Sequence, residues 1–271
     1  MLRSNQRDGY AALMQAAAEA IVELARDKRY IGGTVGVLAV LHTWTQQLVY
    51  HPHVHCLVTG GGVSVDGLSW CPARRDYLVP TVALARLVRG KLKAGLAKRR
   101  PDLVVPDAAW RKPWVVHCTA WGDGAEAVLR YLARYVNRVA ITNGRIVGLD
   151  DAGVTIRHKQ RTSGRWLTSL GGHEFMRRFL LHVLPKGLHK IRYYGLWHPS
   201  RREQAARARL LLQLGRPTAQ SGVASTNEPR DDATASSSAP DSVEPVRICP
   251  SCKVGRLVQI GRLYPKQASG P

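Results

Sequence analysis

Three histidines at alternate positions, His51, His53 and His55, lie in the stretch YHPHVHCLVTGGG at 50–62. If this stretch is a β-strand, all three side chains share one face, because strand side chains alternate between faces. Two imidazoles at this spacing can bind one divalent cation. Mn, Fe, Co, Ni and Zn suit nitrogen ligands, and Mg is tolerated when phosphate oxygens and water complete the shell. We therefore predict a metal site at His53 and His55.

The alternative is that these histidines are structural. A lone histidine usually is, but three buried imidazoles on one apolar strand would each need a separate hydrogen-bond partner. The metal site is therefore the favoured interpretation. Its third ligand stays open: His51 is in register with the pair, and Gln46 or Gln47 could reach it from the preceding turn.

A second motif, YLARYVNR at 131–138, repeats a tyrosine followed three residues later by an arginine: Tyr131 with Arg134, and Tyr135 with Arg138. Residues four apart stack on one helical face, so core packing alone would account for two tyrosines. A phenol is a poor nucleophile at its usual pKa of about 10. It can attack a phosphate that a metal polarises while a cation stabilises the developing charge. Together, the two motifs predict phosphodiester transesterification.

PHVH followed downstream by YLARYVNR resembles the HUH endonucleases, whose name denotes two histidines around a hydrophobic residue. Within them, the chain is similar to the two-tyrosine rolling-circle transposases of the insertion-sequence-91 type. Family-like segments occur in family order between about Asn5 and Arg209. They are LAVLHTWTQQLVYHPHVHCLVTGGG, RYLARYVNRVAITNGRIV, EFMRRFLLHVLPKG and IRYYGLW.

This resemblance implies cleavage of single-stranded DNA at the ends of a mobile element, and strand transfer through a 5′-phosphotyrosine. It makes the histidine pair the ligands of a divalent ion, Mg or Mn, and the two tyrosines the nucleophiles. It assigns contact with DNA phosphates to Arg134 and Arg138. Two other functions stay open: a transposase remnant that binds DNA without chemistry, and a metal-dependent hydrolytic nuclease whose tyrosines only pack in the core.

The sequence departs from the family pattern at both ends. Members usually begin with a cysteine-rich zinc module and a strand of the kind HFVFTLP, whereas this sequence opens at the helix that follows them. This suggests either an N-terminally truncated copy or a misassigned start. Near the other end, CPSC supplies Cys249 and Cys252, half of a four-ligand zinc site. No Cys or His follows Cys252 in the sequence. Zinc binding there would need ligands from a partner chain or from the missing module.

Charge points to a polyanionic partner. The chain has 40 Lys and Arg against 19 Asp and Glu, a formal net charge of +21. This excess favours nucleic acid, although an arginine-rich codon bias is an alternative. No stretch approaches the roughly 18 apolar residues of a membrane span, and the start has no secretion signal. We expect a bacterial cytoplasmic, nucleoid-associated protein that binds single-stranded DNA.

Helices and hairpins are mixed, so the predicted fold class is α+β with a mainly antiparallel sheet. A catalytic domain would span 1–215, followed by a disordered linker over 216–245, rich in small and polar residues, and a small tail over 246–271. The isolated cysteines Cys56, Cys71 and Cys118 are expected in the core. Predicted helices cover 6–27, 81–99, 125–138, 172–184 and 201–214, and predicted strands cover 34–44, 51–58, 63–65, 114–118, 145–149, 153–158 and 190–197.

Overall fold

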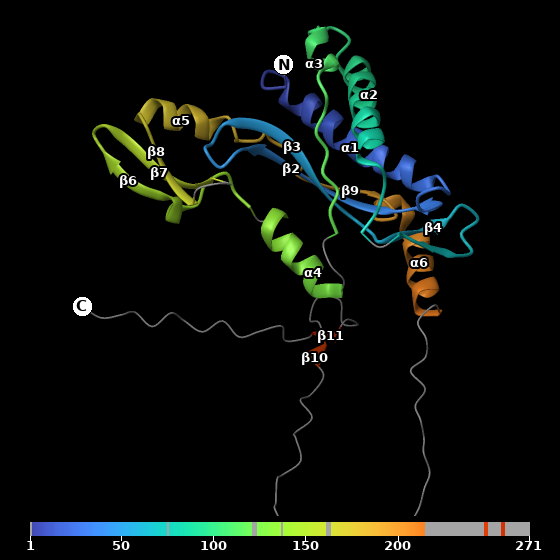
Figure 1. Cartoon of the computed structure of the whole chain (residues 1–271). Coiled ribbons are helices and arrows are strands. Elements are labelled where there is room, and N and C mark those ends of the chain that lie inside the picture. Colours follow the sequence, from blue (N-terminus) through green and yellow to red (C-terminus); the bar gives the residue numbers. More distant parts are fainter. Residues whose placement is uncertain are drawn as a thin grey trace, which may run out of the picture. The chain divides into compact units, whose positions relative to one another are not determined.

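The computed structural model of the chain describes residues 2–74, 76–120, 124–136, 138–160 and 164–214, and the pairs 247–248 and 256–257. The chain divides into two units, Met1–Thr218 and Ala219–Pro271. In the second unit, β10 (Arg247–Ile248) pairs with β11 (Arg256–Leu257) in antiparallel orientation. The linker expected over 216–245 lies outside the described residues. The fold is α+β with antiparallel sheets, as predicted (Figure 1).

The histidine motif lies in a three-stranded antiparallel sheet with the order β3–β2–β9. The middle strand, β2 (Gly36–Trp44), is buried along nearly its whole length, which explains why most of its residues are apolar. Its neighbours are β3 (Tyr50–Val58) and β9 (Ile191–Gly195). Both pairings are antiparallel, so side chains at alternate positions of the three strands form two distinct faces.

Two helices cover one face of this sheet. α1 (Gln6–Arg26) packs on β2 and β3, and α2 (Thr81–Arg99) packs on α1 (Figure 1). Alanines of α1 permit close approach, and Ala39 and Leu41 of β2 join them in one core with leucines of α2. The buried positions of α2 recur every four residues, the period of a single helical face: Leu84, Val88, Leu92 and Leu96.

A smaller sheet, β1–β4–β5, explains the glycine run that follows the histidines. Its strands are β1 (Gly33–Thr34), β4 (Gly61–Ser64) and β5 (Trp70–Pro72). A Cβ on Gly62 would lie 2.7 Å from the carbonyl oxygen of Thr34, so only glycine fits that contact. α6 (Arg202–Leu214), which follows the short 3₁₀ turn η3 (Pro199–Arg201), packs on this sheet.

A third sheet, β6–β7–β8, braces the turn between β2 and β3. Leu48 of that turn is fully buried in the core of this sheet. The carbonyls of Gln46, Gln47 and Leu48 accept hydrogen bonds from Arg145, Arg178 and His182. These bonds secure the hairpin that carries the histidines. The strands of the third sheet are β6 (Ile146–Asp150), β7 (Gly153–Gln160) and β8 (Gly164–Leu170). The 3₁₀ turn η2 (Asn143–Arg145) precedes them in the sequence, and the helix α5 (Gly172–Leu180) follows them.

Two expectations about local structure are wrong, and a third is right only in part. Residues 112–120 include no strand: the predicted strand at 114–118 is an extended, unpaired segment after the short helix α3 (Asp107–Arg111). Cys118, expected in the core, is exposed, whereas Cys56 and Cys71 are partly buried. The predicted helix at 125–138 is α4 (Gly124–Tyr131), which continues as a π-helical turn, η1 (Leu132–Val136).

Candidate metal and tyrosine site

The β2–β3 hairpin places three histidines on one face of the sheet. His42 of β2 lies directly opposite His53 of β3, and Val40 lies opposite His55. Because side chains alternate along each strand, His42, His53 and His55 all project from the face that α1 does not cover. His42 is only 2% exposed.

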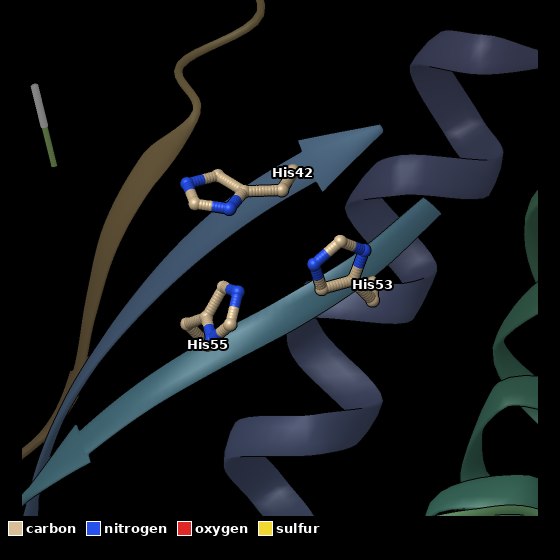
Figure 2. Close-up of side chains that lie close together, drawn as sticks. All are labelled: His42, His53 and His55. Carbon is tan, nitrogen blue, oxygen red and sulfur yellow. The ribbon is translucent and has the colours of Figure 1, made fainter. Parts of the chain in front are cut away.

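The donor nitrogens of His42, His53 and His55 lie within 4.8 Å of one another. Figure 2 shows the three rings turned toward a shared space between the two strands. Imidazole nitrogens bind first-row metals at about 2.0–2.1 Å, which places two ligands of one tetrahedral ion about 3.4 Å apart. Small side-chain rotations would therefore close this group, here called the histidine triad, around a single divalent ion.

Hydrogen bonds to the backbone orient two rings of the triad. Nε2–H of His42 donates to the carbonyl oxygen of Tyr135 at 2.8 Å, and Nδ1–H of His53 donates to the carbonyl oxygen of His51 at 2.7 Å. A carbonyl oxygen can only accept, so these nitrogens carry the ring protons. The lone pairs of His42 Nδ1 and His53 Nε2 therefore remain for an ion. Metal-binding histidines in proteins are commonly held by such outer hydrogen bonds.

Burial keeps the triad neutral. Desolvation lowers the pKa of His42 to about 4 and that of His55 to about 3, and also lowers the pKa of His53. The neighbouring histidines and the positive charge of Arg138 add to this lowering for His42 and His55. A neutral imidazole is the form that binds a metal, so ion binding at pH 7 would displace no proton from these rings.

Sequence reasoning did not find His42. The three positions proposed for the third ligand, His51, Gln46 and Gln47, are all exposed, and His51 contributes its backbone carbonyl to His53. The structure groups His42 with the predicted pair instead. A signal was present in the sequence, because His42 interrupts the apolar run TVGVLAVLHTW, where a buried polar side chain needs a reason.

The two tyrosines lie on the same face of the sheet as the triad. Their rings are 4.8 Å apart, and the ring of Tyr135 is 4.3 Å from that of His55 and 6.2 Å from that of His42. Tyr131 is 4% exposed and packs against Leu38 and Val40 of β2. Burial raises the pKa of Tyr131. Tyr135 is half-buried and lies closer to the triad.

The tyrosines straddle the change from α-helix to π-helix. Tyr131 is the last residue of α4, and Tyr135 lies within η1. A π-helical turn is rare and often occurs at functional sites, because its wider winding changes the direction in which side chains point. Here it accompanies the bond from His42 to the Tyr135 carbonyl.

The two arginines of the motif are both exposed. The positive charge of Arg138 contributes to lowering the pKa of all three triad histidines. The backbone carbonyl of Arg138 accepts a 3.5 Å hydrogen bond from Lys190 Nζ. Cys249 and Cys252, the candidate zinc ligands of the tail, lie outside the described residues.

The sequence also matches known proteins. Residues 36–205 match the model of a family described as "Putative transposase". The chain is 37% identical over 275 residues to "Putative transposase y4qJ" of Sinorhizobium fredii (strain NBRC 101917 / NGR234), covering 93% of this chain and 67% of that protein. It is 26% identical over 200 residues to "Transposase for insertion sequence element IS801" of Pseudomonas savastanoi pv. phaseolicola, covering 68% of this chain and 48% of that protein. No solved structure matches.

The family match covers more than half of the chain and includes the histidine triad and both tyrosines. Across the described residues, no helix is both long enough and apolar enough to cross a membrane. The chain spans 67% of the first relative and 48% of the second. By the extent of the family match and the identity to the first relative, this chain belongs to the transposase family.

Proposed function

We propose that this chain cleaves single-stranded DNA at the ends of a mobile element and transfers the cut strand through a 5′-phosphotyrosine. A divalent ion, Mg or Mn, would be held by His42, His53 and His55, and when bound would polarise the scissile phosphate. The observation that carries this proposal is the 4.3 Å separation of the Tyr135 and His55 rings on one face of the sheet.

The chemistry is a balanced transesterification. The phenolic oxygen of a tyrosine attacks phosphorus, the bond to the 3′ oxygen breaks, the phenol loses its proton, and the leaving strand gains one as a free 3′-hydroxyl. Attack of a 3′-hydroxyl on the phosphotyrosine reverses the step and joins a new pair of strands. Each step forms one phosphate ester bond for the one that it breaks, so the transfer needs no nucleotide cofactor.

We assign the first cut to Tyr135. It is nearer the triad than Tyr131, and it is half-buried, so a phosphate can reach it. Tyr131 packs among Leu38 and Val40 and its pKa is raised, which disfavours the phenolate. It would act after Tyr135 has taken up a strand. The exposed cations Arg134 and Arg138 would contact DNA phosphates on either side.

The test is capture of the covalent intermediate. Single-stranded DNA spanning an element end is incubated with the chain and Mn²⁺, then separated in denaturant. A 3′-labelled strand should move with the protein, and a 5′-labelled strand should be released with a free 3′-hydroxyl. The adduct should vanish in the Tyr131→Phe, Tyr135→Phe double variant. Cleavage that persists in that variant would instead identify a hydrolytic nuclease, and binding without cleavage by the wild type would identify a DNA-binding remnant.

A further inference from the structure

A basic hollow lies on the side of the β3–β2–β9 sheet that α1 and α2 cover. This hollow, of about 470 Å³, is bordered by the first turns of α2 and by residues 113–116 of the extended segment. This segment leaves α3 and runs back beside α2 in Figure 1. Its Trp114 and Val116 pack on the same core as Leu84 and Val88 of α2, which secures one wall of the hollow against the other.

Three arginines line this hollow: Arg86 and Arg89 from α2, and Arg111 from α3. Among the described lining residues, none is acidic. Arg89 also donates to the carbonyl oxygen of Lys112 at 3.4 Å, and Arg111 lies 3.8 Å from Asp107. Both members of that last pair are more than three-quarters exposed, so it offsets little of the positive charge.

The positive charge of the hollow continues along one face of α2 as a stripe of cationic side chains. Arg86, Arg89 and Lys93 are three and four residues apart, so they share one helical face beside the face that packs on α1. Lys98 projects from the other side of the helix. A stripe of cations on one face fits a linear polyanion better than a single phosphate.

The floor between these cations is apolar and aromatic. Trp114 lines the hollow and lies parallel to Trp110, with ring centres 6.1 Å apart and planes at 12°. Val82 and Val115, also in the lining, are 64% and 78% exposed. Unpaired bases can contact such a floor while their phosphates meet the arginines, whereas a duplex keeps its bases stacked inside.

We propose that this arginine groove, Arg86, Arg89 and Arg111 around Trp114, is a binding site for single-stranded DNA separate from the histidine triad. The inference deepens the proposed function: the groove would hold the strand that the tyrosines cut. It lies on the helical side of the sheet, so it would hold DNA away from the reacting phosphate and add affinity without taking part in the chemistry.

The experiment measures binding of a fluorescent oligo(dT) across a series of salt concentrations, without added divalent ions. The background is the Tyr131→Phe, Tyr135→Phe variant, which forms no adduct. Each lost phosphate contact lowers the slope of log affinity against log salt by about 0.7 for a single strand. Arg86→Gln with Arg89→Gln should therefore lower the slope by about 1.4. Lys98→Gln, on the same helix but outside the groove, should leave it unchanged.

Thermal unfolding of the variants tests whether any loss of DNA affinity comes from a folding defect. If the Arg86→Gln, Arg89→Gln variant and Lys98→Gln give the same slope of log affinity against log salt, the proposed binding site in the groove is wrong. The proposal is also wrong if the arginine variant loses as much affinity for a duplex of the same length as for oligo(dT), because the groove would then not distinguish unpaired bases. Adduct formation by the wild-type chain is scored separately: its absence overturns the proposed function, whereas a normal adduct with an unchanged slope overturns only the groove.

Discussion

Nε2–H of His42 donates a 2.8 Å hydrogen bond to the carbonyl oxygen of Tyr135. One imidazole thereby belongs to the candidate metal site and also holds the backbone of the proposed nucleophile. The ring of His42 is itself fixed by stacking on Trp44, with ring centres 4.7 Å apart and planes at 22°. Ion binding and the position of the tyrosine turn are therefore linked through a single side chain.

Replacing His42 should loosen the tyrosine turn even without an ion. In His42→Ala, the backbone amides of η1 should exchange with deuterium faster than in the wild type, because their anchor to β2 is lost. His53→Ala is the matched control: it also removes a triad ligand, but its hydrogen bond goes to His51 and not to the turn. Equal exchange in the two variants would show that the bond to Tyr135 does not hold the turn.

His42, and not His51, should determine ion affinity. We expect His42→Ala to weaken Mn²⁺ or Ni²⁺ binding by at least about tenfold, because loss of a hydrogen-bond partner of a ligand already costs that much. His51→Ala should change the affinity little, because the exposed His51 side chain lies outside the triad and its carbonyl remains. Isothermal titration calorimetry of both variants distinguishes the two candidates. A larger loss in His51→Ala would restore it as the third ligand.

The two tyrosines should contribute unequally to the first cleavage. Tyr135→Phe should slow the first cleavage about a thousandfold or more, as loss of a nucleophile does. Tyr131→Phe should leave first cleavage within a few-fold and reduce joining of the cut strand to a second one. Single-turnover cleavage and strand-transfer assays on labelled oligonucleotides measure the two steps. The reverse ranking would assign the first cut to Tyr131.

Ion binding should resist mild acid. Ordinary histidines protonate near pH 6.5, but the pKa of His42 is lowered to about 4 and that of His55 to about 3. The pKa of His53 is lowered as well, so we expect the fall in Ni²⁺ affinity to begin below pH 6.5 and to continue to about pH 3–4. A tenfold fall in affinity between pH 7 and 6 would mean that the rings are solvated and titrate normally.

The same lowering has a consequence for the ion-free protein. The unfolded chain takes up protons on these histidines as the pH falls through 6.5, and the folded triad does not until lower pH. The free energy of unfolding should therefore decrease as the pH falls from 6.5 toward 4. Urea unfolding of wild type and of a His55→Gln variant across this range measures the decrease in the free energy of unfolding. The decrease should be smaller in the variant.

Arg138 should have opposite effects on the ion and on DNA. Its charge disfavours a second cation near the triad, so Arg138→Gln should tighten Mn²⁺ binding by about two- to fivefold. The same change would remove the proposed contact with a DNA phosphate and should weaken single-strand binding. In Arg134→Gln we expect only weaker DNA binding. Parallel calorimetry and DNA titrations test the contrast, and equal ion affinity in both variants would remove Arg138 from the site.

Much of the candidate site follows from local spacing. Alternation along a strand is a steric property of the extended backbone, so His53 and His55 share a face wherever the strand lies. A four-residue spacing on a helical segment likewise brings Tyr131 and Tyr135 together. The helices α1 and α2 and the hairpin strands, which have strong periodicity, also match their predicted positions.

Tertiary structure decided the rest. His42 joins the triad because the register of β2 against β3 places it opposite His53, and that register depends on the turn that the third sheet clamps. Residues 114–118 have a strand-like composition, but only Trp114 and Val116 pack inward, on a core shared with α1 and α2, and the segment pairs with no strand. The π-helical turn also lacks a local signal. Local sterics set which side chains share a face, whereas pairing register and packing between distant segments select which faces meet.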